Sequence, residues 1–359
     1  GLERLRSEHL DFPGQPFASA ASPVQIGPAR RLELHPRSNR LDEANPAHWL
    51  WDSVRVDRLA PAPDGSAFLI AIEEDAGVRQ LWLVPLDGGP PLPVGPAEDV
   101  REFGWSPDAA YIVYTRFAPG AAAASPLRPF AVLRVPRPRA AVVERADEPA
   151  GNLVTGLFTD QLPGLTAEGV WFFHAGTLWL APYAGGDPQA LWTGVNSPQA
   201  PRPAPDGARL AFVCRSTVCL AGPDGGAVQE LALPGPRPSV AHLAWSPDGE
   251  RLAVIDRDPN DLRPVRLVIV TRAGETELAV EIAPRDATDP PQWTLDGQVV
   301  LVQTFPQDGR RIIAVDLPSR QVVDLSQEHW DAYFGLLPDS RTLLLNNGRG
   351  DFWAAELRR

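Results

Sequence analysis

Short hydrophobic runs with strand character recur along the whole chain and predict an all-β fold. Each run holds a few mostly apolar, often β-branched or aromatic residues and is bounded by Gly, Pro, Asp or Ser, the pattern of short strands between turns. The first set of runs covers 67–72, 111–115, 170–173, 209–213, 251–255, 299–302 and 342–345. A second run follows several of them, at 81–84, 178–180, 266–270, 312–315 and 352–355. No run approaches the ~18 consecutive apolar residues of a membrane-spanning helix.

A turn signature precedes every run of the first set. Its fullest form is Trp-Ser-Pro-Asp-Gly at 245–249, and successive acidic residues of its copies lie 38 to 60 residues apart. The copies are centred on Asp64, Asp108, Glu168, Asp206, Asp248, Asp296 and Asp339. In the Pro-Asp-Gly core, proline presets φ, the aspartate binds its own backbone two residues on, and glycine takes a positive φ. Because ~40–45 residues is the period of a four-stranded propeller blade, the sequence predicts a seven-bladed β-propeller of four-stranded antiparallel blades.

The repeated turn residues have a structural interpretation. Trp105, Trp245 and Trp293 each precede a turn, and a large aromatic side chain there is expected to pack between adjacent blades. The acidic residues of the turns are also interpreted as structural, because the same position recurs in all seven repeats, whereas a catalytic role would concern a single site.

The last unit is expected to borrow a strand from the N-terminus. It supplies first, second and third strands near 332–336, 342–345 and 352–357, after which the sequence ends. The alternating segment 29–34 is the predicted fourth strand, which would close the ring and remove its free edges. We expect an N-terminal extension or linker at 1–25 and one propeller domain at 26–359. The expected blades are 50–97, 98–150, 151–196, 197–237, 238–284, 285–328, and 329–359 together with 28–36.

Composition narrows the chemistry. The formal net charge is −12 with no basic stripe, and all 33 basic residues are arginine, which argues against nucleic-acid binding and excludes lysine nucleophiles and Schiff bases. Of the 40 prolines, five lie in the seven blade turns, so part of the excess is architectural. The sequence begins at Gly1, so a signal peptide, lipid anchor or transmembrane helix would lie upstream of it.

The Trp-Ser-Pro-Asp-Gly turn followed by a hydrophobic strand resembles the propeller repeats of TolB-like proteins, a bacterial branch of the WD-repeat-like propellers. The resemblance extends from about residue 50 to the end. It implies one of the roles found in that family: a periplasmic interaction scaffold, a sensor ectodomain, or a propeller that gates a serine peptidase. The chain lacks the small α/β domain that precedes the TolB ring. It also lacks the Gly-x-Ser-x-Gly elbow of peptidase relatives, which argues against a serine hydrolase.

Few residues offer reactive chemistry. Cys214 and Cys219 flank a predicted tight hairpin connection and are expected to form a disulfide, which implies an oxidising, extracytoplasmic compartment; the alternative is two free thiols. The acidic loop with Asp256, Asp258 and Asp261 is a weak calcium candidate, and a solvated loop is the preferred interpretation. No cofactor is expected. The six histidines are His9, His35, His48, His174, His242 and His329, and a catalytic or metal-binding cluster would require several of them to meet at the central channel.

Binding is expected on the face opposite the Pro-Asp-Gly turns, because loops on a rigid scaffold usually carry recognition. This face, which we call the loop face, holds the connections into each innermost strand and those between the two middle strands of each blade. The pairs His48-Trp49 and His329-Trp330 lie near the ring closure, and the longest loop spans 117–129. The partner-binding candidates are His48, Trp49, Glu73, Arg116, Phe117, Arg128, Asp258, Arg310, His329, Trp330 and Arg349.

Three hypotheses for function follow. The preferred one is a non-catalytic, extracytoplasmic interaction scaffold that binds a protein or envelope partner through the loop face, with no nucleic-acid partner. The second is a propeller enzyme, such as a metal-dependent lactonase or a glycan-acting hydrolase or lyase, with its site in the central channel. The third is a ligand-sensing ectodomain of a membrane-anchored protein.

Overall fold

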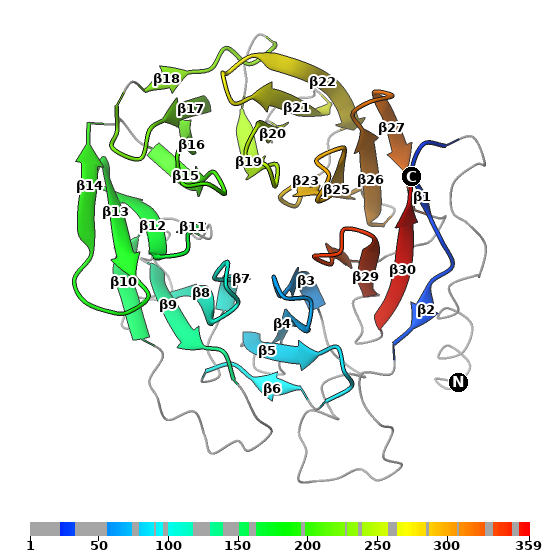
Figure 1. Cartoon of the computed structure of the whole chain (residues 1–359), viewed down its shortest axis with the longest axis horizontal. Coiled ribbons are helices and arrows are strands. Elements are labelled where there is room, and N and C mark those ends of the chain that lie inside the picture. Colours follow the sequence, from blue (N-terminus) through cyan, green and yellow to red (C-terminus); the bar gives the residue numbers. More distant parts are fainter. Residues whose placement is uncertain are drawn as a thin grey trace.

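The computed structural model describes residues 22–32, 56–73, 79–89, 91–95, 100–117, 130–138, 151–157, 163–194, 198–226, 228–235, 239–257, 264–284, 287–306, 309–326, 333–346 and 352–359. Within these residues the fold is all-β, with seven antiparallel sheets arranged as the blades of one ring (Figure 1). No helix among them could span a membrane.

The first four blades each contain four strands. They are blade 1 with β3 (Val56–Pro61), β4 (Ala67–Glu73), β5 (Arg79–Pro85) and β6 (Leu92–Pro93); blade 2 with β7 (Val100–Trp105), β8 (Tyr111–Phe117), β9 (Phe130–Pro136) and β10 (Gly151–Leu157); blade 3 with β11 (Gly164–Leu165), β12 (Gly169–His174), β13 (Thr177–Pro182) and β14 (Gln189–Thr193); and blade 4 with β15 (Pro198–Pro203), β16 (Leu210–Cys214), β17 (Thr217–Ala221) and β18 (Gln229–Glu230).

The remaining three blades follow the same order, with one divided strand in each of the last two. They are blade 5 with β19 (Val240–Trp245), β20 (Arg251–Asp256), β21 (Val265–Thr271) and β22 (Thr276–Ala283); blade 6 with β23 (Ala287–Thr288), β24 (Gln292–Trp293), β25 (Val299–Phe305), β26 (Arg311–Asp316) and β27 (Gln321–Asp324); and blade 7 with β28 (Tyr333–Leu336), β29 (Thr342–Asn346), β30 (Phe352–Arg358), β1 (Gln25–Ile26) and β2 (Arg30–Arg31). In blades 1 to 6 the chain enters at the innermost strand, and in blade 7 the N-terminal strands β1 and β2 lie outside β30.

The ring closes through the N-terminal segment, as predicted. Both β1 and β2 pair antiparallel with β30, with Ile26 opposite Leu357 and Arg31 opposite Trp353. The predicted single strand is two short ones, since Pro28 lies between them and has no N–H to donate to the ladder. The pairing also begins earlier than expected, at Gln25.

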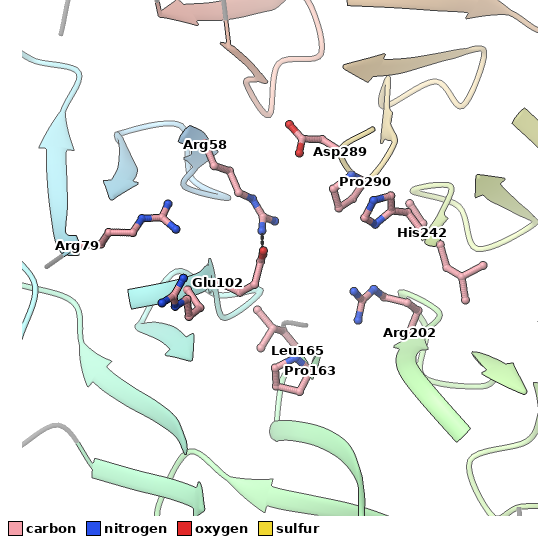
Figure 2. Close-up of a pocket in the computed structure, with 12 residues that line it drawn as sticks. Arg58, Arg79, Glu102, Pro163, Leu165, Arg202, His242, Asp289 and Pro290 are labelled. Carbon is pink, nitrogen blue, oxygen red and sulfur yellow. Dashed lines mark hydrogen bonds and ion pairs between the residues drawn. The ribbon is translucent and has the colours of Figure 1, made fainter. Parts of the chain in front are cut away.

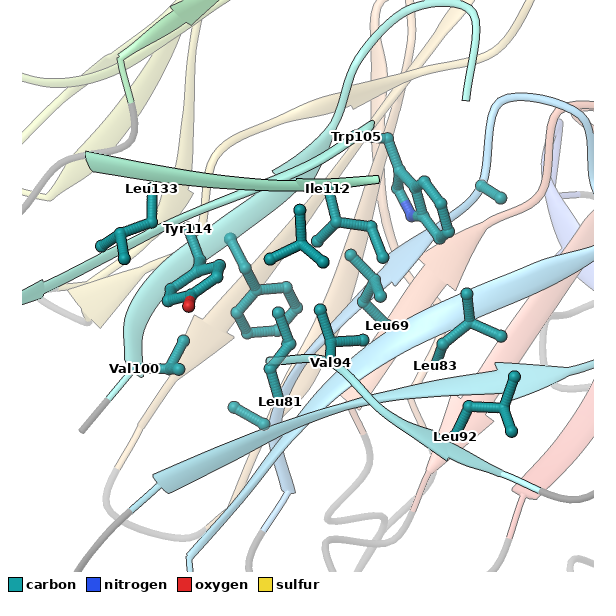
Figure 3. Close-up of a cluster of buried hydrophobic side chains, with 14 of the residues drawn as sticks. Leu69, Leu81, Leu83, Leu92, Val94, Val100, Trp105, Ile112, Tyr114 and Leu133 are labelled. Carbon is teal, nitrogen blue, oxygen red and sulfur yellow. The ribbon is translucent and has the colours of Figure 1, made fainter. Parts of the chain in front are cut away.

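The hydrophobic core is a ring of seven clusters, one in each seam between neighbouring blades. Figure 3 shows the seam between blades 1 and 2, where Leu69 and Leu83 pack with Trp105 and Tyr114. On β4, Leu69 faces this seam while its neighbour Ile70 faces the seam with blade 7. The middle strands are therefore apolar on both faces, which is why their sequences are nearly continuous hydrophobic runs.

The signature tryptophans link neighbouring blades. The Nε1–H groups of Trp105, Trp245 and Trp293 donate to the carbonyl oxygens of Ala60, Arg202 and Ala244, at 2.9, 2.8 and 3.0 Å. Each acceptor lies on the innermost strand of the preceding blade, so the indole both fills the seam and satisfies a backbone group there. The predicted packing role is confirmed.

The signature aspartates hold the turns. In six copies Oδ1 accepts a hydrogen bond from the backbone N–H two residues on, at 2.9 to 3.1 Å. Three of these aspartates also pair with the arginine that ends or follows the third strand of the next blade: Asp64 with Arg137, Asp206 with Arg272, and Asp296 with Arg359. Their role is architectural, as the repeat indicated.

Candidate functional site

A cavity of about 500 Å³ lies on the ring axis. Its lining comes almost entirely from the innermost strands and from the residues beside them, and six of the seven blades contribute within the described residues. Figure 2 shows the side chains that surround this space. They are Arg58, Arg79, Arg101, Glu102, Pro163, Leu165, Arg202, His242, Leu243, Ala244, Asp289 and Pro290.

The blade repeat explains which side chains reach the cavity. Counting back six residues from the turn aspartate gives Arg58 in blade 1, Glu102 in blade 2, His242 in blade 5 and Pro290 in blade 6, all of which line it. In blade 4 the corresponding residue is Ala200, which has a positive φ of 50°, and the lining residue there is Arg202 instead. These positions were not predicted, although aligning the seven repeats on their turns identifies most of them from sequence.

Charged side chains of both signs line the cavity. Arg58 forms an ion pair with Glu102 across neighbouring blades, and Figure 2 shows this pair facing Arg202 on the other side of the space. The pKa of Arg202 is lowered to about 10, first by burial and then by repulsion from Arg58, while the Glu102 carboxylate opposes the shift. Arg202 therefore remains a cation at neutral pH, in surroundings that disfavour its charge.

His242 lies in the wall of the same cavity as a neutral imidazole. Its Nε2 atom is 2.8 Å from the carbonyl oxygen of Thr288, and because a carbonyl only accepts, this nitrogen carries the proton. Burial lowers the pKa of His242 to about 4; Arg202 and other arginines lower it, and the Thr288 bond opposes the shift. Among the described residues, no three His, Cys, Asp or Glu side chains are grouped so as to hold a metal ion.

Two arginine–aromatic clusters lie where strands end at the loop face. The blade 2 cluster consists of Arg101, Phe117 and Phe130: the Arg101 guanidinium carbon is 4.7 Å from the Phe117 ring centre, and the two phenyl rings stack with centres 4.7 Å apart. Arg116, another predicted partner contact, is half-buried beside Phe117 on β8. These residues form the base of the long blade 2 loop.

The second cluster spans the seam between blades 6 and 7 and consists of Arg310, Phe305 and Tyr333. The Arg310 guanidinium carbon is 3.9 Å from the Tyr333 ring centre and 5.8 Å from that of Phe305. Arg310 also donates a hydrogen bond to the Tyr333 hydroxyl. Arg310 was predicted as a loop-face residue, but its aromatic partners were not recognised.

The other predicted loop-face residues stay predictions. His48, Trp49, Arg128, Asp258, His329, Trp330 and Arg349 lie outside the described residues, as do His9 and His35. Glu73 is described only as the last backbone position of β4, paired with Arg79. His174 ends β12 at an exposed hairpin turn, away from the residues that line the cavity.

The two cysteines are joined by a disulfide with a Cα–Cα distance of 5.8 Å. They are diagonal neighbours across the hairpin, because Cys214 pairs with Thr217 and Cys219 with Phe212. The predicted connection was the four residues between the cysteines, 215–218, whereas the structure has only Arg215-Ser216 between the two strands.

The weak calcium candidate Asp256 has protein partners for both oxygens. Its Oδ1 accepts a hydrogen bond from the Ser239 N–H at 2.8 Å, and its Oδ2 pairs with Arg266. Asp258 and Asp261 lie outside the described residues, so the complete loop stays a prediction.

No family model matches the sequence, and no curated protein matches it either. Solved structures do resemble the fold. An oligogalacturonate lyase in complex with manganese gives a TM-score of 0.57 at 12% identity, covering 96% of each chain. The C-terminal WD40 domain of Sif2 gives 0.57 at 11% identity, covering 94% of this chain and 90% of that one. TolB from Acinetobacter baumannii gives 0.49 at 15% identity, covering 85% of this chain and 65% of that one. At these identities the likeness is one of fold alone, and the fold is the seven-bladed β-propeller that the turn signature predicted.

Proposed function

We propose that this protein is a non-catalytic interaction module that binds a protein partner through its loop face. The observation that carries the proposal is the pair of arginine–aromatic clusters at that face, around Phe117 in blade 2 and Arg310 at the seam of blades 6 and 7. Aromatic residues and arginine are the side chains most enriched at interface centres and binding hot spots. A guanidinium stacked on a ring is already packed on one face, so less conformational freedom is lost when a partner contacts the cluster.

The proposal includes an extracytoplasmic location. Its support is the disulfide between Cys214 and Cys219, because structural disulfides persist in oxidising compartments and are rare in a reducing cytosol.

The test is site-specific photocrosslinking in cells that express the native protein. A photoreactive phenylalanine analogue replaces Phe117, and the matched control carries it at Leu295, a turn-face residue whose side chain is 65% exposed. The expected result is an adduct with one discrete protein from position 117 and none from position 295. Binding of that purified protein should then weaken in Arg101→Ala. Identical adducts from both positions, or an unchanged affinity in Arg101→Ala, would refute the loop-face proposal.

A second candidate function, a propeller enzyme with its site in the channel, rests on the titratable groups Glu102, His242 and Asp289 around one cavity. Turnover of a lactone or glycan panel that is abolished by Glu102→Gln and retained in Phe117→Ala would favour the enzyme over the scaffold.

A further inference from the structure

We propose that the outer edge of blade 5 binds an extended segment of a basic protein, which joins the blade as a further β-strand alongside β22. The edge lies on the rim of the ring, whereas the arginine–aromatic clusters lie at the loop face. The site therefore goes beyond the partner proposed above and does not depend on it. Three observations carry the proposal: the length of β22, its regular pairing with β21, and the exposed glutamates beside it.

The strand β22 offers a long free edge. It has eight residues, and the outermost strands of the other six blades have only two to seven. It ends the strand order of its sheet, so among the described residues it pairs only with β21. Figure 1 shows it on the rim between β18 and β27. An edge strand directs alternate backbone N–H and C=O groups away from its sheet, where another strand can pair with them.

The centre of this edge is regular and firmly held. The four residues 278–281 pair with 266–269 without a bulge, although a bulge is one of the devices that keep an edge from pairing. Leu278 and Ile282 are buried in the seam with blade 6, and Val280 packs against them, whereas Ala279 and Glu281 are exposed. A partner strand therefore meets a preformed template, and little ordering of this chain is needed on binding.

The exposed side chains of the edge favour a basic partner. Glu275 and Glu281 are exposed, and neither carboxylate forms an ion pair or a hydrogen bond with any described residue. Arg266, which lies opposite Glu281 in the ladder, is already engaged by Asp256 and by the Pro234 carbonyl. Opposite charges on facing strands are favourable and like charges are unfavourable. A strand that carries arginine or lysine at alternate positions therefore fits this edge.

The same charges disfavour a second copy of this chain as the occupant. Two β22 edges side by side would bring the unpartnered carboxylates of one copy near those of the other. The formal net charge of −12 adds a long-range repulsion between copies, and it attracts a basic segment instead. The occupant is therefore a basic strand from another protein.

Fluorescence anisotropy of labelled peptides with the full chain tests the proposal. The probe is acetyl-Arg-Val-Arg-Val-Arg-Val-Arg-amide, which alternates basic and β-branched side chains. The same peptide with N-methylated backbone nitrogens keeps the side chains and the charge but has no N–H to donate, and it should bind at least about tenfold more weakly. Equal binding of the two peptides would show charge attraction alone and overturn strand addition. Equal binding of a peptide with glutamate in place of arginine would overturn the basic partner.

One variant and a matched control assign the binding to the edge. Glu281→Arg replaces attraction by repulsion beside the added strand and should weaken binding of the arginine–valine peptide about tenfold. Glu250→Arg makes the same change of net charge at a turn-face residue whose side chain is 65% exposed, and it should change the affinity less than about twofold. Equal losses in the two variants would show a nonspecific charge effect and overturn the site.

Hydrogen–deuterium exchange of the unmutated protein locates the peptide without relying on any variant. The amides of 276–283 should exchange more slowly with saturating peptide, and those of the outer strands β14 and β27 should be unchanged. No protection of 276–283, or equal protection of all three strands, would overturn the proposal. Self-association of the peptide-free protein with protection of 276–283 would assign the edge to a second copy and also overturn it. Crosslinking at Phe117 separately decides whether the loop-face proposal holds.

Discussion

Replacing Trp105 with Phe should destabilise the ring through one hydrogen bond, and Trp82→Phe provides the control. Both indoles are buried to a similar extent, at 6% and 7% exposed, so both substitutions remove the same atoms from a seam. They differ in one respect: Trp105 Nε1 donates to the Ala60 carbonyl at 2.9 Å, whereas Trp82 Nε1 has no hydrogen-bond partner among the described residues.

The expected difference follows from hydrogen-bond energetics. Trp105→Phe loses a bond worth a net ~1 kcal/mol and leaves the Ala60 carbonyl without this partner, whereas Trp82→Phe removes an unsatisfied buried N–H. The free energy of unfolding should therefore fall by about 2 kcal/mol more in Trp105→Phe than in Trp82→Phe.

Equilibrium urea unfolding followed by far-ultraviolet circular dichroism measures the difference, because removing a tryptophan does not remove the signal. The midpoint should shift while the slope m stays constant. If the free energy of unfolding falls equally in the two variants, or falls more in Trp82→Phe, the seam tryptophans stabilise the fold by their volume alone. Either result would refute the hydrogen-bond argument.

Three further predictions concern stability. Reduction of the Cys214–Cys219 disulfide, or the double Ala variant, should lower the free energy of unfolding by about 2 kcal/mol, because the closed loop is short; identical melting with and without dithiothreitol would contradict this. The free energy of unfolding should fall with decreasing pH in two stages. The upper stage runs from pH 6.5 to about 4, because the pKa of His242 is lowered to about 4 in the folded protein and the unfolded chain binds the proton first. The lower stage lies below pH 3.8, because hydrogen bonds from Ser246 and the Glu250 N–H lower the pKa of Asp248 in the folded protein. His242→Gln should abolish only the upper stage in a pH series of urea midpoints, and an unchanged profile would count against the linkage. Gly169→Ala should lower the free energy of unfolding by several kcal/mol, since the new Cβ would lie 2.2 Å from the Ala181 carbonyl oxygen. Gly186→Ala, whose Cβ would have nothing within 4 Å, should lower it by only ~1 kcal/mol because of the positive φ. Equal melting temperatures of the two variants would disprove the packing argument.

The blade architecture could be predicted from sequence because its signals are local. The Pro-Asp-Gly turn fixes its own backbone geometry, and the run after it is apolar on both faces, as at 67–72 and 299–302. The role of Trp105 could be predicted for the same reason, since one position in each repeat faces the same seam. The N-terminal closure required only the observation that blade 7 lacked a strand.

The cavity was not predicted because the residues that line it give no distinctive sequence signal within a single blade. Arg58, Arg202 and His242 are ordinary polar residues in alternating strands, and only the ring brings them together. The repeat position six residues before each turn aspartate carries this information, but in blade 4 that position is Ala200, and the residue that lines the cavity is Arg202. Aromatic partners such as Tyr333 were missed because the cluster around Arg310 crosses two blades.

The pairing of β1 and β2 with β30 has a consequence for how the protein folds. Gln25 pairs with Arg358, the longest sequence separation among the described strand pairs, so this contact closes the largest loop and carries the highest entropic cost. During synthesis β1 and β2 are made first, and they have no strand to pair with until β30 is made. Blades 1 to 6 can assemble from neighbouring residues as the chain lengthens, whereas blade 7 must wait for both ends. Ring closure is therefore expected to be the final step of folding, and an N-terminal segment held away from β30 would leave an open edge able to recruit another chain.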